Sequence, residues 1–174
     1  MRVELVFPTM DYADSWQEAM NDLDAEGTKG FWKVPGVPLN VSEYVPYTKE
    51  AAEGKNLPKG WVPNSTFWLI VDGEFVGHGN IRHELNDWLS RIGGHIGYTI
   101  APKHRRKGYG TKILELLLPE AARLGHEKVL MTCDEDNVGS RKIIERVGAE
   151  FEGGAEWEGK QIRRYWLQVS PGVV

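Results

Sequence analysis

The sequence predicts a single α+β domain of mixed α/β order, in which one central, twisted, mostly antiparallel sheet is flanked by helices. Three observations support this prediction. The chain has 174 residues, a length typical of one domain. Short β-rich segments alternate with amphipathic helical segments along most of it. An Asp-Gly pair at residues 72–73 joins two β-rich segments, which is a strong signal for an antiparallel hairpin.

The first half of the chain is expected to contain a strand, a helix, a loop region and the hairpin. The strand is predicted at 3–7, and the helix at 11–23, where apolar residues recur at helical spacing. Residues 28–64 contain five prolines, which predict a loop-rich region around a short helix near 41–54. The hairpin strands are predicted at 65–71 and 75–83.

The second half is expected to alternate strands and helices. A turn of helix within 84–92 precedes a strand at 95–100. A long helix follows at 107–124, and Pro119 inside it is expected to kink it or to split off its last turn. After this helix, a strand at 128–132, a helix at 137–147 and a final hairpin with its turn at 158–160 complete the domain.

Composition and charge narrow the class of protein. Apolar residues make up 41% and charged residues 26%, the balance of a globular chain. A single cysteine excludes an internal disulfide framework, and the first residues lack the apolar segment of a signal peptide, so a cytoplasmic protein is expected. The longest apolar runs are far shorter than the roughly 20 residues of a membrane helix. The net charge of −4 argues against nucleic acid or an anionic membrane as a partner.

The clearest chemical signal lies at residues 98–111, where a predicted strand leads into a basic, glycine-containing loop that opens a long helix. The free N–H groups and the positive end of a helix dipole attract anions, and Gly108 and Gly110 permit close approach of a phosphate group. The cationic or potentially cationic residues 103–107 would disfavour this helix end unless an anion bound there. The alternative interpretation is a solvated basic turn.

Other phosphate-binding and metal-binding patterns fit the sequence poorly. The dinucleotide fingerprint G-x-G-x-x-G fails because Ile113 occupies its third glycine position, and no P-loop is present. The histidines, the cysteine and the carboxylates lack zinc-site spacing, so no metal is expected. No G-x-S-x-G nucleophile elbow occurs either.

Two motifs resemble those of the GCN5-related N-acetyltransferase (GNAT) superfamily. R-x-x-G-x-G at 105–110 resembles its acetyl-CoA motif, Q/R-x-x-G-x-G/A, and N-x-x-S at 137–140 with R-V-G-A at 146–149 resembles the second motif. The resemblance covers roughly residues 66–152. It implies a GNAT-like single domain over 1–174 that transfers acetyl groups from acetyl-CoA to a primary amine, with 93–148 as the cofactor-binding core.

The resemblance also implies roles for individual residues. Loop amides would bind the pyrophosphate of acetyl-CoA with charge from Arg105 and Lys107, and the pantetheine arm would lie along the preceding strand. The cofactor-binding residues it implies are Tyr98, Thr99, Ile100, Arg105, Arg106, Lys107, Gly108, Tyr109, Gly110, Thr111, Asn137 and Ser140. The amine would attack the thioester directly, so the protein must orient the amine, remove its proton and stabilise the oxyanion.

The catalytic acid departs from the family pattern. Many relatives carry a Tyr near the end of the second cofactor helix that protonates the departing thiolate. The matching residue here is Ile144. Cys133, Ser140 or a water molecule could take this role.

The catalytic base departs from the pattern as well. The usual positions fall near Gly94 and Ile96, which cannot titrate. The candidates are His83, His95, the acidic residues at 134–135, or water. Each histidine could instead be a packed, hydrogen-bonded residue, and the acidic pair could cap a turn.

The acceptor is expected to be a small-molecule or peptide amine bound beside residues 28–64. The aromatic residues of this acceptor-side region could form a wall or lid, with Glu43 or Glu50 attracting a cation, or could form a secondary core. These aromatic residues are Phe31, Trp32, Tyr44, Tyr47 and Trp61. The alternative function is a non-catalytic acyl-CoA-binding or sensor protein of the same fold. The resemblance leaves a homodimer open.

Overall fold

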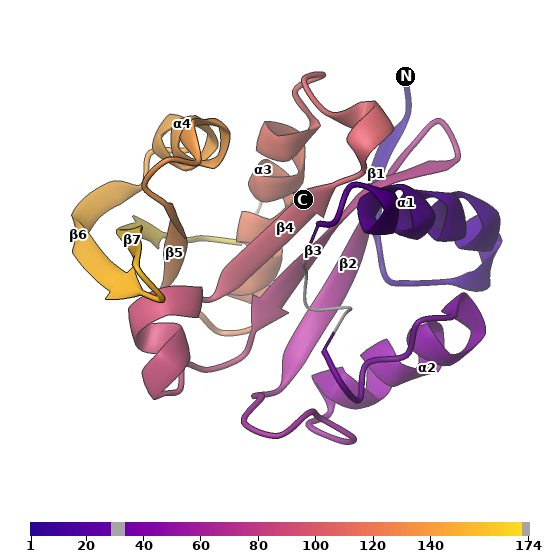
Figure 1. Ribbon diagram of the computed structural model, residues 1–174, viewed down its shortest axis with the longest axis horizontal. Helices are drawn as coiled ribbons and strands as arrows, with labels where there is room; N and C mark the ends of the chain where they lie inside the picture. The colour runs from indigo at the N-terminus through magenta and orange to yellow at the C-terminus, as the bar shows by residue number, and fades with distance from the viewer. Residues whose placement is uncertain (29–33, 172–174) are drawn as a thin grey trace.

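The computed structural model describes residues 1–28 and 34–171. Its strands and helices follow the predicted order (Figure 1). The elements are β1 (Val3–Val6), α1 (Ala13–Ala25), α2 (Val41–Ala52), β2 (Asn64–Val71), β3 (Glu74–Arg82), β4 (Ile96–Ile100), α3 (Tyr109–Arg123), β5 (Lys128–Asp134), α4 (Val138–Arg146), β6 (Glu150–Trp157) and β7 (Lys160–Gln168). Short helical turns occur at η1 (Met10–Tyr12), η3 (Leu89–Gly93) and η4 (Pro102–His104).

The strands form two antiparallel sheets rather than the single sheet that the sequence predicts. One sheet has the order β1-β2-β3-β4 and the other β5-β7-β6. They meet where the main-chain N–H of His95 donates to the carbonyl oxygen of Leu130 at 2.7 Å. From this contact β4 and β5 diverge toward their carboxyl ends (Figure 1). The α+β class is therefore confirmed, and β4 and β5 are the neighbouring edge strands of the two sheets.

Helix α3 packs on one face of the larger sheet. Ile113, Leu114 and Leu117 of α3 are fully buried in a core that includes Ile81 of β3. Gly79 of β3 permits this close packing, because a Cβ atom at this position would lie 2.4 Å from Leu117 Cδ1. We call this surface of the sheet the α3 face.

Helices α1 and α2 cover the opposite face, where large aromatic rings form a second core. The ring of Trp16 stacks on those of Tyr44 and Trp68, with centroid separations of 5.1 Å and 5.9 Å. Tyr47 is buried in the same cluster. For Tyr44 and Tyr47, the secondary-core interpretation is therefore correct. Phe31 and Trp32 lie outside the described residues.

Pro119 does not divide α3, so the expectation that it splits off the last turn is wrong. The helix continues to Arg123 because Leu117 and Ala121, on either side of the proline, are both fully buried in the core beneath α3. Helix α2 likewise continues past Pro46. The hairpin turn is as predicted, with the positive φ angles of 49° at Asp72 and 84° at Gly73 that Asp-Gly adopts in such turns.

Candidate active site

The loop before α3 has the geometry of an anion cradle. Gly108 is the N-cap of α3 and adopts a φ of +84°, and Arg106 adopts +63°. No side chain caps this helix end, so the N–H groups of its first turn are free to bind a ligand. A Cβ atom on Gly108 would meet no heavy atom within 4 Å, so the approach to these groups is open.

The basic residues of the loop divide into paired and unpaired groups. Lys103 contacts the carboxylates of Glu18 and Glu74 at 2.9 Å and 2.5 Å. Arg105 forms a bidentate pair with Glu26 at the end of α1, with N···O distances of 2.6 Å and 3.0 Å. These pairs neutralise the two charges and attach the loop to α1.

Arg106 and Lys107 are exposed and form no ion pair with any described residue. The pairing pattern therefore favours these two side chains, rather than Arg105, as the charges that are free to meet a phosphate. The role that the resemblance gives to Arg105 stays a prediction.

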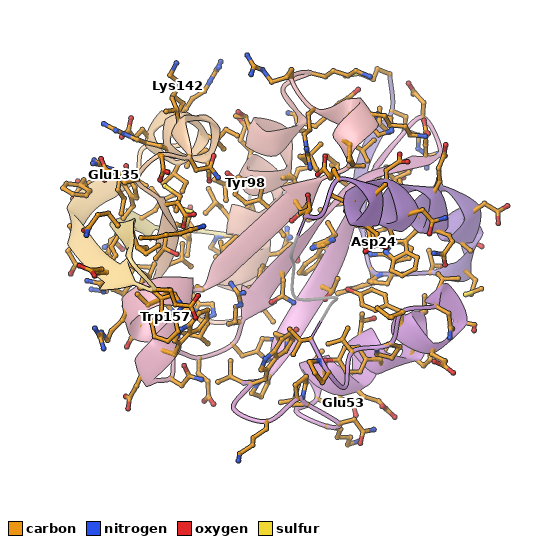
Figure 2. All side chains as sticks on the ribbon, in the orientation of Figure 1. Asp24, Glu53, Tyr98, Glu135, Lys142 and Trp157 are labelled. Atoms are coloured by element: carbon orange, nitrogen blue, oxygen red, sulfur yellow. The ribbon has the colours of Figure 1, made fainter. Side chains whose placement is uncertain are left out.

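The ends of β4, α3 and α4 come together beside the loop. Tyr98, which Figure 2 labels, lies on β4, and its Oη is 3.2 Å from Ser140 Oγ at the start of α4. The Oδ1 atom of Asn137 accepts from the N–H of Ser140 at 3.1 Å and caps α4. Gly110 allows α3 to approach α4, since a Cβ atom there would lie 2.7 Å from Ile143 Cδ1. The segments that carry the two motifs thus lie side by side.

Two further predicted residues lie near this site. Cys133 is a buried free thiol whose pKa is raised, chiefly by burial, which disfavours the thiolate. Ile144 is 1% exposed and belongs to the core under α3. The residue that replaces the usual Tyr therefore serves packing.

The two candidate histidines have different surroundings. His95 Nδ1 accepts a hydrogen bond from the N–H of Leu130 at 2.8 Å, and burial lowers the pKa of its ring to about 4. His83 Nε2 lies 2.7 Å from Ser65 Oγ. Because Ser65 pairs with Ile81 of the α3 core, His83 lies on the α3 face.

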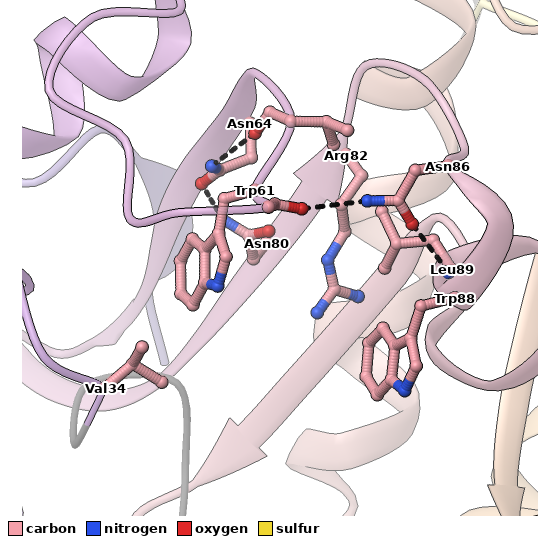
Figure 3. Close-up of a pocket in the computed structure, with 10 residues that line it drawn as sticks. Val34, Trp61, Asn64, Asn80, Arg82, Asn86, Trp88 and Leu89 are labelled. Carbon is pink, nitrogen blue, oxygen red and sulfur yellow. Dashed lines mark hydrogen bonds between the residues drawn. The ribbon is translucent and has the colours of Figure 1, made fainter.

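A cavity of about 560 Å³ opens on the other face, at the start of β2 and the end of β3 (Figure 3). Its floor carries Asn64 of β2 and both Asn80 and Arg82 of β3. Its walls include Trp61 and Trp88. The described lining residues are Val34, Gly60, Trp61, Val62, Asn64, Asn80, Arg82, Asn86, Trp88 and Leu89.

Sequence reasoning missed the polar floor of this cavity. Three polar residues of two β-rich segments line the cavity: Asn64 on β2, and Asn80 and Arg82 on β3. Thr66 and His78 continue the same alternation along the two strands. Such alternation places polar groups on one buried face of a sheet, and buried polar groups cost free energy unless they have partners. This signal could have indicated a binding surface.

One lining residue of the cavity, Arg82, reaches β4, the strand beside which the pantetheine arm was expected. A Cβ atom on Gly97 would lie 3.2 Å from Nη1 of Arg82. Of the residues predicted to contact the acceptor, Trp61 lines the cavity. Glu43 and Glu50 are not among its described lining residues.

Residues 1–28 and 34–171 contain neither a candidate metal site nor a candidate membrane span. No group of three or more His, Cys, Asp or Glu side chains in these ranges could hold a metal ion. None of the helices there is long and apolar enough to cross a membrane.

Comparison with known proteins identifies the family. Residues 2–150 match a family model described as an acetyltransferase (GNAT) domain. The chain is also 30% identical over 146 residues to the uncharacterized N-acetyltransferase YjdG of Bacillus subtilis (strain 168), covering 81% of this chain and 80% of the relative. The chain therefore belongs to the GNAT acetyltransferase family, as the motifs predict.

Solved structures share the fold at low sequence identity. RimL, described as a ribosomal L7/L12 alpha-N-protein acetyltransferase in complex with coenzyme A, has a TM-score of 0.67 and 14% identity, covering 98% of this chain and 96% of its own. Mycobacterium smegmatis RimJ, in complex with CoA-disulfide, has a TM-score of 0.69 and 21% identity, covering 95% and 81%. These similarities confirm the GNAT fold.

Proposed function

We propose that this protein transfers the acetyl group of acetyl-CoA to a primary amine. The observation that carries the proposal is the open, uncapped start of α3 at Gly108, beside the unpaired cations Arg106 and Lys107. Free N–H groups, a helix dipole and two cations form a site suited to a pyrophosphate. CoA-bound relatives with this fold support the same ligand.

The divergence of β4 and β5 gives the pantetheine arm a place beside β4. From the loop, the arm would follow the main chain of residues 98–100 like an added strand, with polar main-chain groups available to it. A main-chain N–H of β4 could then polarise the thioester carbonyl and stabilise the oxyanion. Residues 93–148 would form the cofactor-binding core.

The acceptor amine would enter from the opposite side, through the cavity under Trp61 and Trp88. Since Arg82 lies over Gly97, this cavity reaches the strand beside which the thioester would lie. The amine would attack the thioester carbon directly. Its nitrogen would bond to the carbonyl carbon to give a tetrahedral oxyanion, and the amine proton would pass to water. Collapse of the oxyanion would re-form the carbonyl and break the carbon–sulfur bond, and the sulfur would leave as the CoA thiolate, which then takes a proton.

Water is the acceptor of the amine proton that the geometry supports best. No carboxylate or imidazole is among the described lining residues of the cavity. His83 lies on the other face of the sheet, and Nδ1 of His95 already accepts from Leu130. The Tyr98–Ser140 hydroxyl pair is the candidate for returning a proton to the thiolate.

Calorimetric titration with acetyl-CoA tests the proposal with two matched variants. Gly108→Val places a β-branched side chain over the free N–H groups, and it should weaken binding at least about tenfold. Gly159→Val is the control, because Gly159 has a similar φ of +78° and similarly open surroundings in the β6–β7 turn. It introduces the same backbone strain far from the loop and should leave affinity unchanged.

Release of free CoA thiol with a panel of primary amines tests the transfer itself. Equal acetyl-CoA affinity in wild type and Gly108→Val would contradict the proposed cofactor site. Tight binding without thiol release for any amine would instead favour an acyl-CoA-binding sensor, an alternative supported by Ile144 and by the lack of a base in the cavity.

A further inference from the structure

The cavity contains the guanidinium of Arg82, which has no counter-charge among the described residues. Arg82 Nη1 donates to the carbonyl oxygen of Gly93 at 3.4 Å, and no described carboxylate lies within ion-pair distance of it. Figure 3 shows its guanidinium directed between the indoles of Trp61 and Trp88. Burial lowers its pKa to about 10, so it remains protonated at neutral pH. A partly buried cation without a counter-charge is costly, and an anionic ligand would relieve that cost.

We infer that the acceptor is a small amine that also carries a carboxylate, and that Arg82 binds this carboxylate within the cavity. The inference rests on the proposed function, because it assumes that the cavity holds the acceptor. The planar guanidinium suits a carboxylate, to which its N–H groups can donate in parallel. Diamines and other polycationic amines would instead place a second positive charge against Arg82.

The floor of the cavity also offers an acceptor for an ammonium or amine group. Asn80 Nδ2 donates to Asn64 Oδ1 at 2.7 Å and to Thr66 Oγ1 at 3.2 Å, while Asn64 Nδ2 donates to the carbonyl of Val62. Thr66 is bonded in turn to Tyr44. This chain of bonds fixes the amide of Asn80, so that its oxygen remains available for a ligand N–H.

The spacing of these groups favours a compact acceptor. Asn80 pairs with Gly97 in the β3–β4 register, and Arg82 lies over the same glycine. An acceptor that places its amine near β4 and its carboxylate at Arg82 therefore needs only a few bonds between the two groups, as in a free amino acid. The walls at Trp61 and Trp88 suit an apolar or planar side chain.

The test compares matched acceptors on wild-type protein saturated with acetyl-CoA, measuring thiol release. L-Phenylalanine, its amide and phenethylamine share an aromatic ring and a primary amine and differ at the carboxylate position, so their rates are compared per concentration of free amine. β-Alanine and 2-aminoethyl phosphate contrast a carboxylate with a phosphate. Putrescine and a tetrapeptide amide represent polyamines and peptide N-termini. Wild type should prefer the carboxylate member of each pair by at least about tenfold in kcat/KM.

Arg82 variants identify the group responsible. Arg82→Met removes the charge at similar length and should abolish the preference while leaving acetyl-CoA affinity unchanged, whereas Arg82→Lys should retain part of it. Arg123→Met is the control, since Arg123 lies on α3 and pairs with Glu120. Thermal unfolding of each variant confirms that it is folded.

A direct binding measurement separates this inference from the proposed function. Quenching of tryptophan fluorescence should report binding of the same acceptors to the CoA-loaded protein, because Trp61 and Trp88 line the cavity. Binding of carboxylate amines that depends on Arg82, without thiol release, would retain Arg82 as a carboxylate site and overturn the inference that these amines are the acceptors, whereas thiol release with other amines alone would leave the proposed function standing. A preference for the amide, the phosphate, the peptide or putrescine, or a carboxylate preference unchanged in Arg82→Met, would overturn the inference.

Discussion

His95 and Leu130 join the two sheets through a reciprocal pair of hydrogen bonds. The N–H of His95 donates to the oxygen of Leu130 at 2.7 Å, and the N–H of Leu130 donates to His95 Nδ1 at 2.8 Å. The imidazole thus takes the place of a main-chain acceptor. It holds β4 and β5 together at the point from which the two strands diverge. One side chain thus fixes where the strands beside the proposed cofactor site separate.

Replacement of His95 by Ala should destabilise the protein. The buried N–H of Leu130 would lose its acceptor, which typically costs about 1–3 kcal/mol in the free energy of unfolding. Urea unfolding followed by tryptophan fluorescence measures this change. An unchanged free energy of unfolding, together with a loss of turnover at full acetyl-CoA affinity, would instead support His95 as the base.

The junction also shows why the division of the sheet could not be predicted. Strand segments and the Asp-Gly turn are local properties, and these were predicted well from alternation and turn chemistry. The choice between one sheet and two depends on the pairing of residues 95 and 130, which are far apart in the sequence. Alternation places His95 on one side of a strand but cannot show that its ring bonds to a main-chain N–H.

The stability of the protein should fall as the pH is lowered from about 6.5 to 5. Burial lowers the pKa of His78 to about 3 and that of His95 to about 4, from 6.5. The unfolded chain therefore binds protons below about pH 6.5 that the folded chain excludes. Each ring should reduce the free energy of unfolding by up to roughly 1.4 kcal/mol per pH unit.

Urea unfolding at several pH values in this window measures that slope. The ion-paired carboxyl groups of Glu26 and Glu74 have pKa values below 4.5, so they contribute at more acidic pH. His78→Leu should reduce the slope of the unfolding free energy against pH by about the contribution of one histidine ring. A free energy of unfolding that is constant from pH 6.5 to 5 would show that these rings titrate normally.

Gly79→Ala should destabilise the packing of α3 on β3. The added methyl would lie 2.4 Å from Leu117 Cδ1 and 2.9 Å from Cδ2. Overpacking of this kind typically costs about 1–3 kcal/mol. A double-mutant cycle with Leu117→Ala checks the cause, because the extra methyl should cost less in the background that has space for it. Equal costs in both backgrounds would assign the effect to the backbone of β3.

The contact between Gly79 and Leu117 depends on long-range packing, which a local sequence pattern does not specify. Leu114 and Leu117 were placed on an amphipathic helix by their spacing, but nothing in the sequence identified Gly79 as their partner. The pairing of Arg105 with Glu26 is similar, because the motif indicated a phosphate-binding arginine while the fold brings a carboxylate from α1 to it. Long-range packing decides both cases.

His83→Ala should leave turnover within a few-fold of wild type. The ring bonds to Ser65 on the α3 face, whereas the cavity opens on the other side of the sheet. Steady-state kcat and acetyl-CoA affinity, measured together, check this. If kcat falls about 100-fold at unchanged affinity, the size of effect expected for a general base, His83 takes part in catalysis and water does not suffice.

Ser140→Ala and Tyr98→Phe should each lower kcat more than they lower acetyl-CoA affinity. The two hydroxyls lie 3.2 Å apart between β4 and the start of α4, and burial raises the pKa of Tyr98, which keeps it protonated. Loss of a proton donor to the thiolate typically costs about 100-fold in kcat. Because the hydroxyls act as one bonded pair, the double variant should be little slower than the slower single variant.

Asn137→Ala is the matched control for this pair. It removes the side chain that caps α4 through the N–H of Ser140 and leaves both hydroxyls in place. Loss of such a cap typically costs about 1 kcal/mol of stability. If kcat falls equally in Asn137→Ala and Ser140→Ala, the position of α4 matters and the hydroxyl does not. Ser140→Ala keeps the main-chain N–H that donates to Asn137, so the cap of α4 stays intact in that variant. A large fall of kcat in Ser140→Ala alone would therefore assign proton delivery to the hydroxyl pair.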